Sequence, residues 1–105
     1  MSKTKRGEVW LADLGLAAKV RPVLVISVPF TDPDYALVSV IPHTTSPRGS
    51  RFEVALDVPW LQQGAFNIQA GLAVPEAKIL RKLGTLNADQ LLRIESSLKS
   101  WLGFR

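Results

Sequence analysis

The stretch Lys19-Val20-Arg21-Pro22-Val23-Leu24-Val25-Ile26-Ser27 lies in the first third of this 105-residue chain. From Pro22 to Val28 almost every residue is apolar and several are β-branched, which is typical of a strand buried on both faces. Pro22 cannot donate to a sheet ladder, but the first residue of a strand tolerates that loss. Proline also biases the preceding residue toward an extended conformation. The stretch therefore predicts a rigid strand that carries the guanidinium of Arg21 at its entrance, where it is suited to binding a phosphate.

Length and composition predict a single domain over residues 1–105. The absence of cysteine excludes disulfides and cysteine-based zinc sites. No apolar segment has the length of a signal peptide or a membrane helix, so we expect a cytoplasmic protein that does not contact a membrane. Thirteen Lys and Arg residues against nine Asp and Glu give a formal charge of +4. This balance favours a polyanionic or acidic partner.

Short strands separated by turn residues are predicted along most of the chain. Alternation of apolar and polar residues, or short apolar runs, predicts strands over residues 7–14, 22–28, 35–41, 51–56, 67–74 and 76–79. Pro42 is expected to end the third of these strands. In the fourth, Phe52, Val54 and Leu56 should face the core. Residues 58–64 are interpreted as one helical turn or a tight loop closed by glycine.

The clearest predicted element is a helix over residues 88–102. Asn87 and Gln90 have the spacing of a capping box, and Gly103 stands where a left-handed residue would end the helix. An apolar stripe at helical spacing runs along it, comprising Leu91, Ile94, Leu98, Trp101 and Leu102. Short strands with one packing helix indicate a mainly β (α+β) fold, a small barrel with a C-terminal helix.

Three motifs together resemble the MazF/PemK family of toxins from bacterial toxin–antitoxin pairs. They are Arg6-Gly7-Glu8-Val9-Trp10-Leu11-Ala12-Asp13-Leu14, Arg21-Pro22-Val23-Leu24-Val25-Ile26-Ser27 and Ile41-Pro42-His43-Thr44-Thr45-Ser46. The resemblance extends over nearly the whole chain. It implies a small SH3-like β-barrel of the CcdB/PemK type that forms a homodimer and cuts single-stranded RNA without a metal. It also implies a cognate antitoxin that holds the enzyme inactive.

The same resemblance implies that Arg21, in the Arg-Pro motif, and Thr44, in the Pro-x-Thr motif, form the catalytic pair. Two departures from the family pattern stand out. The stretch from Leu14 to Val20 is short and lacks the Ser-Glu-Gln sequence that many members carry. After the predicted fifth strand, Pro75-Glu76-Ala77-Lys78 replaces the usual acidic residue followed by Gln and then Arg.

RNA supplies its own nucleophile, because the 2′-hydroxyl can attack the adjacent phosphate and leave a 2′,3′-cyclic phosphate and a 5′-hydroxyl. That reaction requires neither a metal nor another cofactor, and the sequence contains no carboxylate or histidine cluster with ligand spacing. Arg21 would stabilise the charge that develops on the phosphate, and Thr44 would donate its hydroxyl to a phosphate oxygen or the 2′-oxygen. Arginine stays protonated and is a poor base, so the proton acceptor remains to be found.

Two residues are possible acids or bases. His43 is the only histidine and titrates near neutrality, but strand alternation would turn it to the face opposite Thr44. We therefore favour an exposed residue at a strand end. Glu76 is the second candidate, and a solvated surface carboxylate is its preferred interpretation. Thr44 itself could instead cap a turn. Contacts to the RNA are expected from Lys19, Thr45, Ser46, Arg48, Arg51 and Lys78, and Trp60 is among the aromatic residues that could stack on a base.

Two other functions fit parts of the sequence. The tail Trp101-Leu102-Gly103-Phe104 loosely resembles the tryptophan–glycine tail of the CcdB toxins, which poison DNA gyrase without cutting nucleic acid. A catalytically inactive RNA- or protein-binding barrel is the other alternative. For either toxin, the basic charge predicts an acidic and partly disordered antitoxin segment that folds over the Arg21 region.

Overall fold

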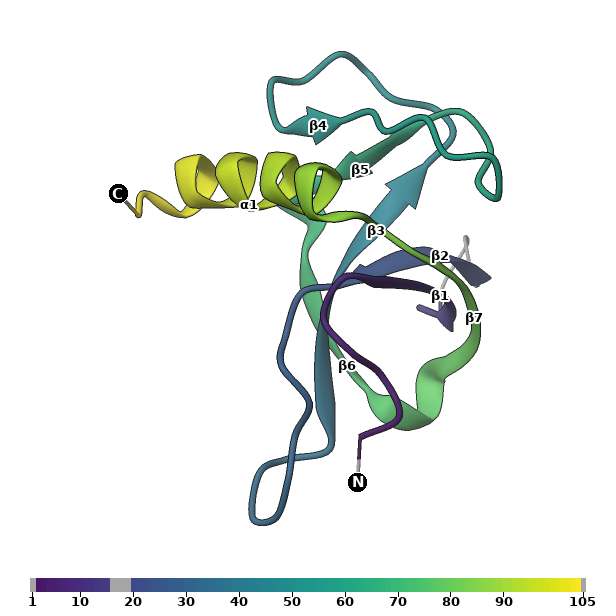
Figure 1. Cartoon of the computed structure of the whole chain (residues 1–105), viewed down its shortest axis with the longest axis vertical. Coiled ribbons are helices and arrows are strands. Elements are labelled where there is room, and N and C mark those ends of the chain that lie inside the picture. Colours follow the sequence, from purple (N-terminus) through teal and green to yellow (C-terminus); the bar gives the residue numbers. More distant parts are fainter. Residues whose placement is uncertain (1, 16–19, 105) are drawn as a thin grey trace.

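The computed structural model describes residues 2–15 and 20–104 (Figure 1). Its strands are β1 (Glu8–Asp13), β2 (Val20–Val25), β3 (Leu37–Thr44), β4 (Glu53–Val54), β5 (Ala65–Asn67), β6 (Leu72–Pro75) and β7 (Ile79–Thr85). Two 3₁₀ turns, η1 (Ile68–Ala70) and η2 (Glu76–Lys78), flank β6, and the chain ends in helix α1 (Ala88–Leu102). Within the described ranges, none of the helices has the length and apolar character to cross a membrane.

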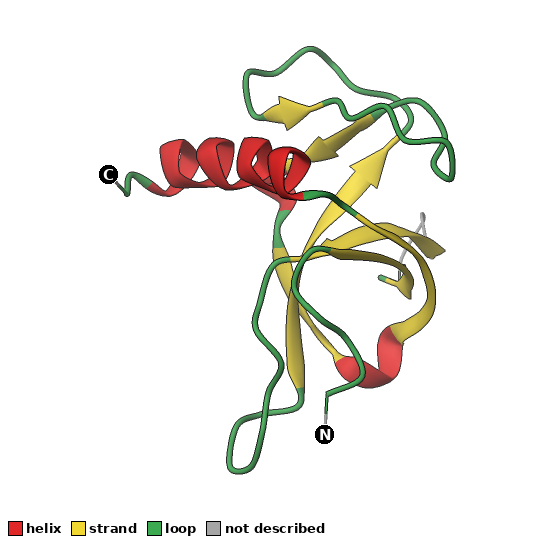
Figure 2. Ribbon diagram, viewed as in Figure 1, coloured by secondary structure: helices red, strands yellow, loops and turns green. Residues whose placement is uncertain are grey.

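The strands form one antiparallel sheet in the order β4-β5-β3-β2-β1-β7, and β6 pairs with the first half of β3. The sheet curves strongly, with α1 lying across one side of it (Figure 2). The predicted mainly β fold with a C-terminal helix is confirmed. The sheet itself is open, because among the described residues β4 and β7 pair with one neighbour each and not with each other.

Strand β2 is buried on both faces, as predicted. Val23 and Val25 belong to a core cluster on one face of the sheet, together with Ala12, Val38, Val40, Val74 and Ile79. Leu24 points to the other face, into the cluster that also contains Ile94 of α1. All three β2 side chains are fully buried. Apolar packing on both faces thus holds β2 in place, and this packing also restrains its first residues.

The prediction that Pro42 ends the third strand is wrong, because β3 continues to Thr44. On the edge of β3 that faces away from β2, β6 pairs as far as Val40 and β5 begins at His43. Pro42 stands between these two partners, so its missing N–H interrupts no ladder on that edge. The two extra residues, His43 and Thr44, pair with Phe66 and Ala65 of β5.

Three other predicted strands differ from the structure. The predicted strand over 67–74 is divided by η1 into β5 and β6, which pair with the last and first parts of β3. Residues 76–78 form η2, and the long strand β7 follows. Strand β4 covers only Glu53–Val54, although Phe52, Val54 and Leu56 are all buried as predicted. Residues 58–64 form a loop.

Helix α1 has the predicted bounds and the predicted caps. The Asn87 side chain accepts a hydrogen bond from the Gln90 backbone N–H (2.8 Å), and the Gln90 side chain accepts one from the Asn87 N–H (2.9 Å). Gly103 ends the helix with φ of 79°. Ile94 is fully buried, whereas Trp101 and Leu102 near the C-terminal end are 43% and 54% exposed. The apolar stripe therefore covers the core from Leu91 to Leu98, and its C-terminal end is partly exposed.

Candidate active site

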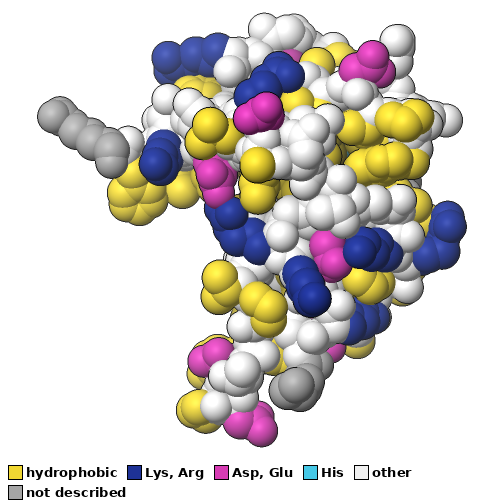
Figure 3. Space-filling view, viewed as in Figure 1, with side chains coloured by type: hydrophobic (Ala, Val, Ile, Leu, Met, Phe, Trp, Pro, Cys, Tyr) yellow, Lys and Arg dark blue, Asp and Glu magenta, His cyan; other side chains and the backbone are white. Residues whose placement is uncertain are grey.

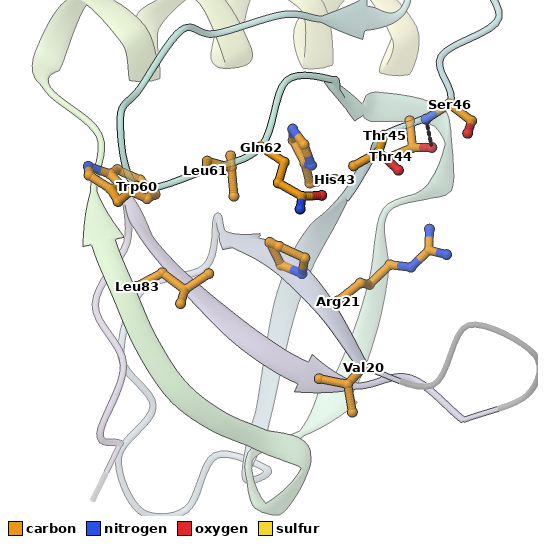
Figure 4. A pocket seen from close by; sticks show the side chains of 11 residues that line it. Val20, Arg21, His43, Thr44, Thr45, Ser46, Trp60, Leu61, Gln62 and Leu83 are labelled. Carbon is orange, nitrogen blue, oxygen red and sulfur yellow. Dashed lines mark hydrogen bonds between the residues drawn. The ribbon is translucent and has the colours of Figure 1, made fainter.

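A cavity of about 490 Å³ opens where β2 begins and β3 ends (Figure 4). Both strands contribute to its wall, as do the loop before β5 and strand β7. The lining residues are Val20, Arg21, Pro22, His43, Thr44, Thr45, Ser46, Trp60, Leu61, Gln62 and Leu83. The cavity therefore contains the central residues of both the Arg-Pro and the Pro-x-Thr motifs.

The strand register brings Arg21 and Thr44 to the same end of the sheet. The last recorded pair between β2 and β3 is Val23 with Pro42. Continued by two residues, this register sets Arg21 opposite Thr44, and both side chains fall on the face of Val23 because strand side chains alternate. Residues 23 positions apart in sequence thus line the same cavity.

Pro22 explains why these strand ends separate and leave a cavity. The Ile26 N–H donates to the Ser39 carbonyl (2.9 Å), so alternate residues of β2, including Leu24 and Pro22, turn their backbone polar groups toward β3. Pro22 has no N–H to donate, and the recorded pairing stops one residue before it. The Arg-Pro sequence therefore ends the ladder and exposes the side chain that precedes it.

The polar groups of Arg21 and Thr44 remain available to a ligand. The Thr44 Oγ1 accepts a hydrogen bond from the Ser46 N–H (3.1 Å), so the turn-capping role considered for Thr44 is present. Its hydroxyl proton is still free to be donated, because a hydroxyl both donates and accepts. Within residues 2–15 and 20–104, the ion pairs join Arg6 to Glu95 and Lys82 to Glu8. Arg21 has no carboxylate partner there.

His43 is buried, with 4% of its surface exposed, so the predicted exposed position is wrong. Its ring meets the edge of Phe66 at a centroid distance of 5.1 Å. Strand alternation does turn it away from the Thr44 face, but the cavity wraps around the end of β3, and both residues line it. Burial lowers the pKa of His43, and the positive charge of Arg21 lowers it further.

The loop over residues 58–64 closes this side of the cavity and depends on two close approaches to glycine. A Cβ on Gly64 would lie 2.0 Å from the Thr44 carbonyl oxygen and 2.8 Å from His43 Cε1. A Cβ on Gly84 of β7 would lie 2.5 Å from the Trp60 ring. The loop thus packs directly on β3 and β7 and places Gln62 at the cavity. Leu61, Gln62 and Leu83 were not identified as site residues from the sequence. Only Trp60, next to Leu61 in the chain, was named from the sequence, as an aromatic residue that could stack on a base.

The residues predicted to contact RNA lie partly inside and partly outside the cavity. Thr45 and Ser46 line it, whereas Arg48 and Arg51 border two different surface hollows. Glu76 and Lys78 follow β6, whose Pro75 pairs with Leu37 at the start of β3. That point is roughly 23 Å from Thr44 at the usual strand rise.

Glu76 was a predicted acid or base, and Lys19 a predicted RNA contact. The Glu76 carboxylate accepts the Lys3 N–H (2.8 Å), so Glu76 supplies no acid or base to the cavity of its own chain. Lys19 lies outside the described residues.

Charged side chains of both signs are mixed on one face of the molecule. On the face shown in Figure 3, Lys and Arg side chains are spread out with Asp and Glu between them. No group of three or more His, Asp and Glu side chains positioned to hold a metal ion occurs in the described part of the chain.

The chain matches known proteins over almost its full length. Residues 5–102 match the family described as PemK-like, MazF-like toxin of type II toxin-antitoxin system. An endoribonuclease from Mycobacterial species, in complex with its cognate antitoxin, has 24% identity and a TM-score of 0.82, and the match covers 97% of each chain. The Mycobacterium tuberculosis toxin MazF-mt6 has 27% identity and a TM-score of 0.79, over 93% of this chain and 98% of that one. A chain of the MazE-MazF crystal structure from Deinococcus radiodurans has 22% identity and a TM-score of 0.81, over 97% of both.

Proposed function

This chain belongs to the family of PemK-like, MazF-like toxins of type II toxin–antitoxin systems, and we propose that it is an endoribonuclease that cleaves single-stranded RNA. The observation that carries the proposal is the presence of Arg21 and Thr44 in the wall of one cavity. Similar structures support the reaction class, since one of them is an endoribonuclease in complex with its antitoxin. We extend the proposal to cytoplasmic action, to a homodimer and to inhibition by an acidic antitoxin.

In this mechanism the 2′-hydroxyl of the substrate attacks the adjacent phosphorus, and the bond from phosphorus to the 5′-oxygen breaks. The forked guanidinium of Arg21 binds two phosphate oxygens and stabilises the charge that develops on them. Thr44 donates its hydroxyl proton to a phosphate oxygen while Ser46 N–H holds its Oγ1 in place. The products are a 2′,3′-cyclic phosphate and a 5′-hydroxyl, and no step requires a metal.

The proposal also includes contacts to the RNA backbone on either side of the cleaved bond. Thr45 and Ser46 are neutral donors beside the reacting phosphate. Lys19, Arg48, Arg51 and Lys78 would supply positive charge farther along the strand. The exposed apolar side chains of Trp101, Leu102 and Phe104 offer surface that a homodimer could bury, and sedimentation equilibrium would measure that assembly.

The experiment incubates end-labelled single-stranded RNA with the protein in EDTA and maps the chemistry of the cut ends. Cleavage should leave a 2′,3′-cyclic phosphate. Arg21→Ala should lower the rate by about 10²–10³, because it removes a donor to the developing oxyanion, and Thr44→Ala should also lower it. Arg93→Ala is the matched control, since Arg93 lies on α1 beside a different hollow, and it should cut RNA at the normal rate. Normal cutting by both cavity variants would contradict the site.

The alternatives are separated by the same samples. RNA binding without any cleavage by the unmodified protein would favour an inactive binding domain. A gyrase poison is not favoured, because the family and the similar structures are those of MazF toxins. The tail that suggested it has a structural role, since Gly103 caps α1 and Trp101 packs at 5.3 Å from the Phe52 ring centroid.

A further inference from the structure

The proposed cleavage needs a group that accepts the proton of the 2′-hydroxyl, and neither Arg21 nor Thr44 can accept it at neutral pH. We propose that the catalytic base of this enzyme is His43. The inference rests on the proposed function, because it assigns a role within the same reaction. It assigns the role of proton acceptor to His43, which was interpreted from its sequence context as an exposed residue at a strand end.

The composition of the cavity supports this assignment. Among its described lining residues, only Arg21 and His43 carry titratable groups; the others are hydroxyl, amide, aromatic and aliphatic side chains. Glu76, the other candidate, lies at the far end of β3 and is hydrogen bonded to the Lys3 backbone. Histidine is therefore the one lining residue that can exchange a proton near neutral pH.

The position of the ring fits the role. His43 on β3 and Gln62 in the closing loop both line the cavity wall, and in the view of Figure 4 both lie above Arg21. The ring is held by the edge contact with Phe66 and by the close approach of Gly64. Neither ring nitrogen forms a hydrogen bond with another described group, and neither is enclosed in the protein without a partner. An acceptor nitrogen is thus free for the substrate, and the ring that carries it is fixed.

The step balances without any further reactant. The 2′-O–H proton passes to the free imidazole nitrogen as the 2′-oxygen forms its bond to phosphorus. The bond between phosphorus and the 5′-oxygen then breaks, and the departing oxygen takes a proton from water. Imidazolium returns its proton to solvent, so the enzyme is regenerated.

The surroundings of His43 keep it in the form that can accept a proton. The one charged group that faces it is Arg21 on β2, while Phe66 on β5 and Gln62 in the closing loop are uncharged. Burial and the Arg21 charge both lower the pKa of His43 below the usual 6.5. The imidazole is consequently neutral at pH 7.

The test is the pH dependence of single-turnover cleavage between pH 4.5 and 9, measured with RNA that the unmodified protein cuts. The rate should rise with unit slope and reach a plateau, with a midpoint below pH 6.5. His43→Gln should lower the rate at pH 7 by about 10²–10⁴ and abolish the plateau, so that the rate continues to rise with hydroxide. Its Kd for a non-cleavable 2′-O-methyl RNA should stay within about threefold, because a base acts on the reacting proton rather than on binding.

Controls separate this role from folding and from RNA recognition. Gln63→Ala changes the next residue of the closing loop, which borders a different hollow, and should keep the plateau and its midpoint. His43→Asn serves as a second variant where circular dichroism shows that His43→Gln is not folded. A folded His43 variant with the normal profile, or one whose loss is entirely in Kd, would overturn the assignment and leave the nuclease proposal intact. If the unmodified protein cuts no RNA at any pH, the proposed function itself fails.

Discussion

At the start of β2, Pro22 determines how the Arg21 side chain is presented. Arg21 is positioned by the residue after it, because Pro22 lacks the N–H that would extend the ladder to β3. The strand is nevertheless held on both faces by Val23 and Leu24. A rigid strand whose first residues pair with β1 but not with β3 therefore presents the guanidinium to the cavity.

Glu8, in the first of the three sequence motifs, has a structural role. It is 8% exposed, and its carboxylate accepts hydrogen bonds from the Lys5 N–H (2.8 Å) and the Trp10 Nε1–H (3.0 Å). Lys82 of β7 forms an ion pair with it at 2.9 Å. Burial raises the pKa of Glu8, but these three partners lower it by more, so the net pKa lies below the usual value. The residue thus joins the N-terminal segment to β1 and β7.

We predict that Glu8→Gln lowers the free energy of unfolding at pH 7 by roughly 1–3 kcal/mol, because it leaves buried donors without their charged acceptor. A carboxylate with a lowered folded pKa stabilises the protein above its unfolded pKa, and that contribution is lost as pH falls through the folded value. The difference between the two proteins should therefore shrink below about pH 4.3. Urea unfolding at several pH values measures it.

Glu95→Gln is the matched control for Glu8, since it breaks the more exposed ion pair with Arg6. It should change the free energy of unfolding by no more than about 1 kcal/mol. An equally small effect of Glu8→Gln at neutral pH would contradict the structural role given to Glu8.

At the scale of elements, the closing loop over residues 58–64 determines the shape of the cavity. Its contacts with β3 and β7 are made at Gly64 and Gly84, where another side chain would overlap neighbouring atoms. The loop has no regular hydrogen-bonded structure of its own. Its position therefore depends on close packing against the strands rather than on local propensity.

We predict that Gly64→Ala lowers the cleavage rate at least about tenfold and destabilises the protein by roughly 1–3 kcal/mol, the usual range for overpacking. The added Cβ would meet the Thr44 carbonyl at 2.0 Å, and a backbone atom cannot simply rotate away. Cleavage assays and thermal unfolding of the same sample measure both effects. Gly71→Ala is the control, because its nearest neighbour would be 3.6 Å away. Similar behaviour of the two variants would show that the loop contact does not shape the site.

At the scale of the whole molecule, charge and the cavity together suggest how an inhibitor acts. The chain carries a formal charge of +4, yet the Lys and Arg side chains on the face in Figure 3 form no single patch. An acidic segment would therefore gain affinity from the overall charge and specificity from the Arg21 cavity. A disordered segment can cover such a surface by folding as it binds.

We predict that an acidic antitoxin segment protects RNA by covering the Arg21 cavity. Its affinity should fall steeply as salt is raised from 50 to 200 mM, because screening weakens charge attraction. Arg21→Ala should weaken binding, whereas Lys78→Ala, at the other end of β3, should change it less. Fluorescence anisotropy of a labelled segment measures this, with RNA cleavage as the second readout. An inhibitor that blocks cleavage equally well with both variants, and independently of salt, would disprove this mode of binding.

The sequence alone was sufficient for the elements whose signals are local. The caps and apolar stripe of α1, the buried run of β2 and the inward side of Phe52, Val54 and Leu56 all depend on residues close together in the chain. The family motifs likewise indicated Arg21 and Thr44, because both stand in short contiguous patterns.

Tertiary structure decided the features that depend on partners far along the chain. Pro42 stays within β3 because β6 and β5 pair on either side of it, and 67–74 is split because each half meets a different part of β3. His43 is buried and faces the cavity because the closing loop packs on it through Gly64. The physical reason is the same in each case: hydrogen-bond pairing and close packing are satisfied between segments, and no local pattern specifies which segment will be the partner.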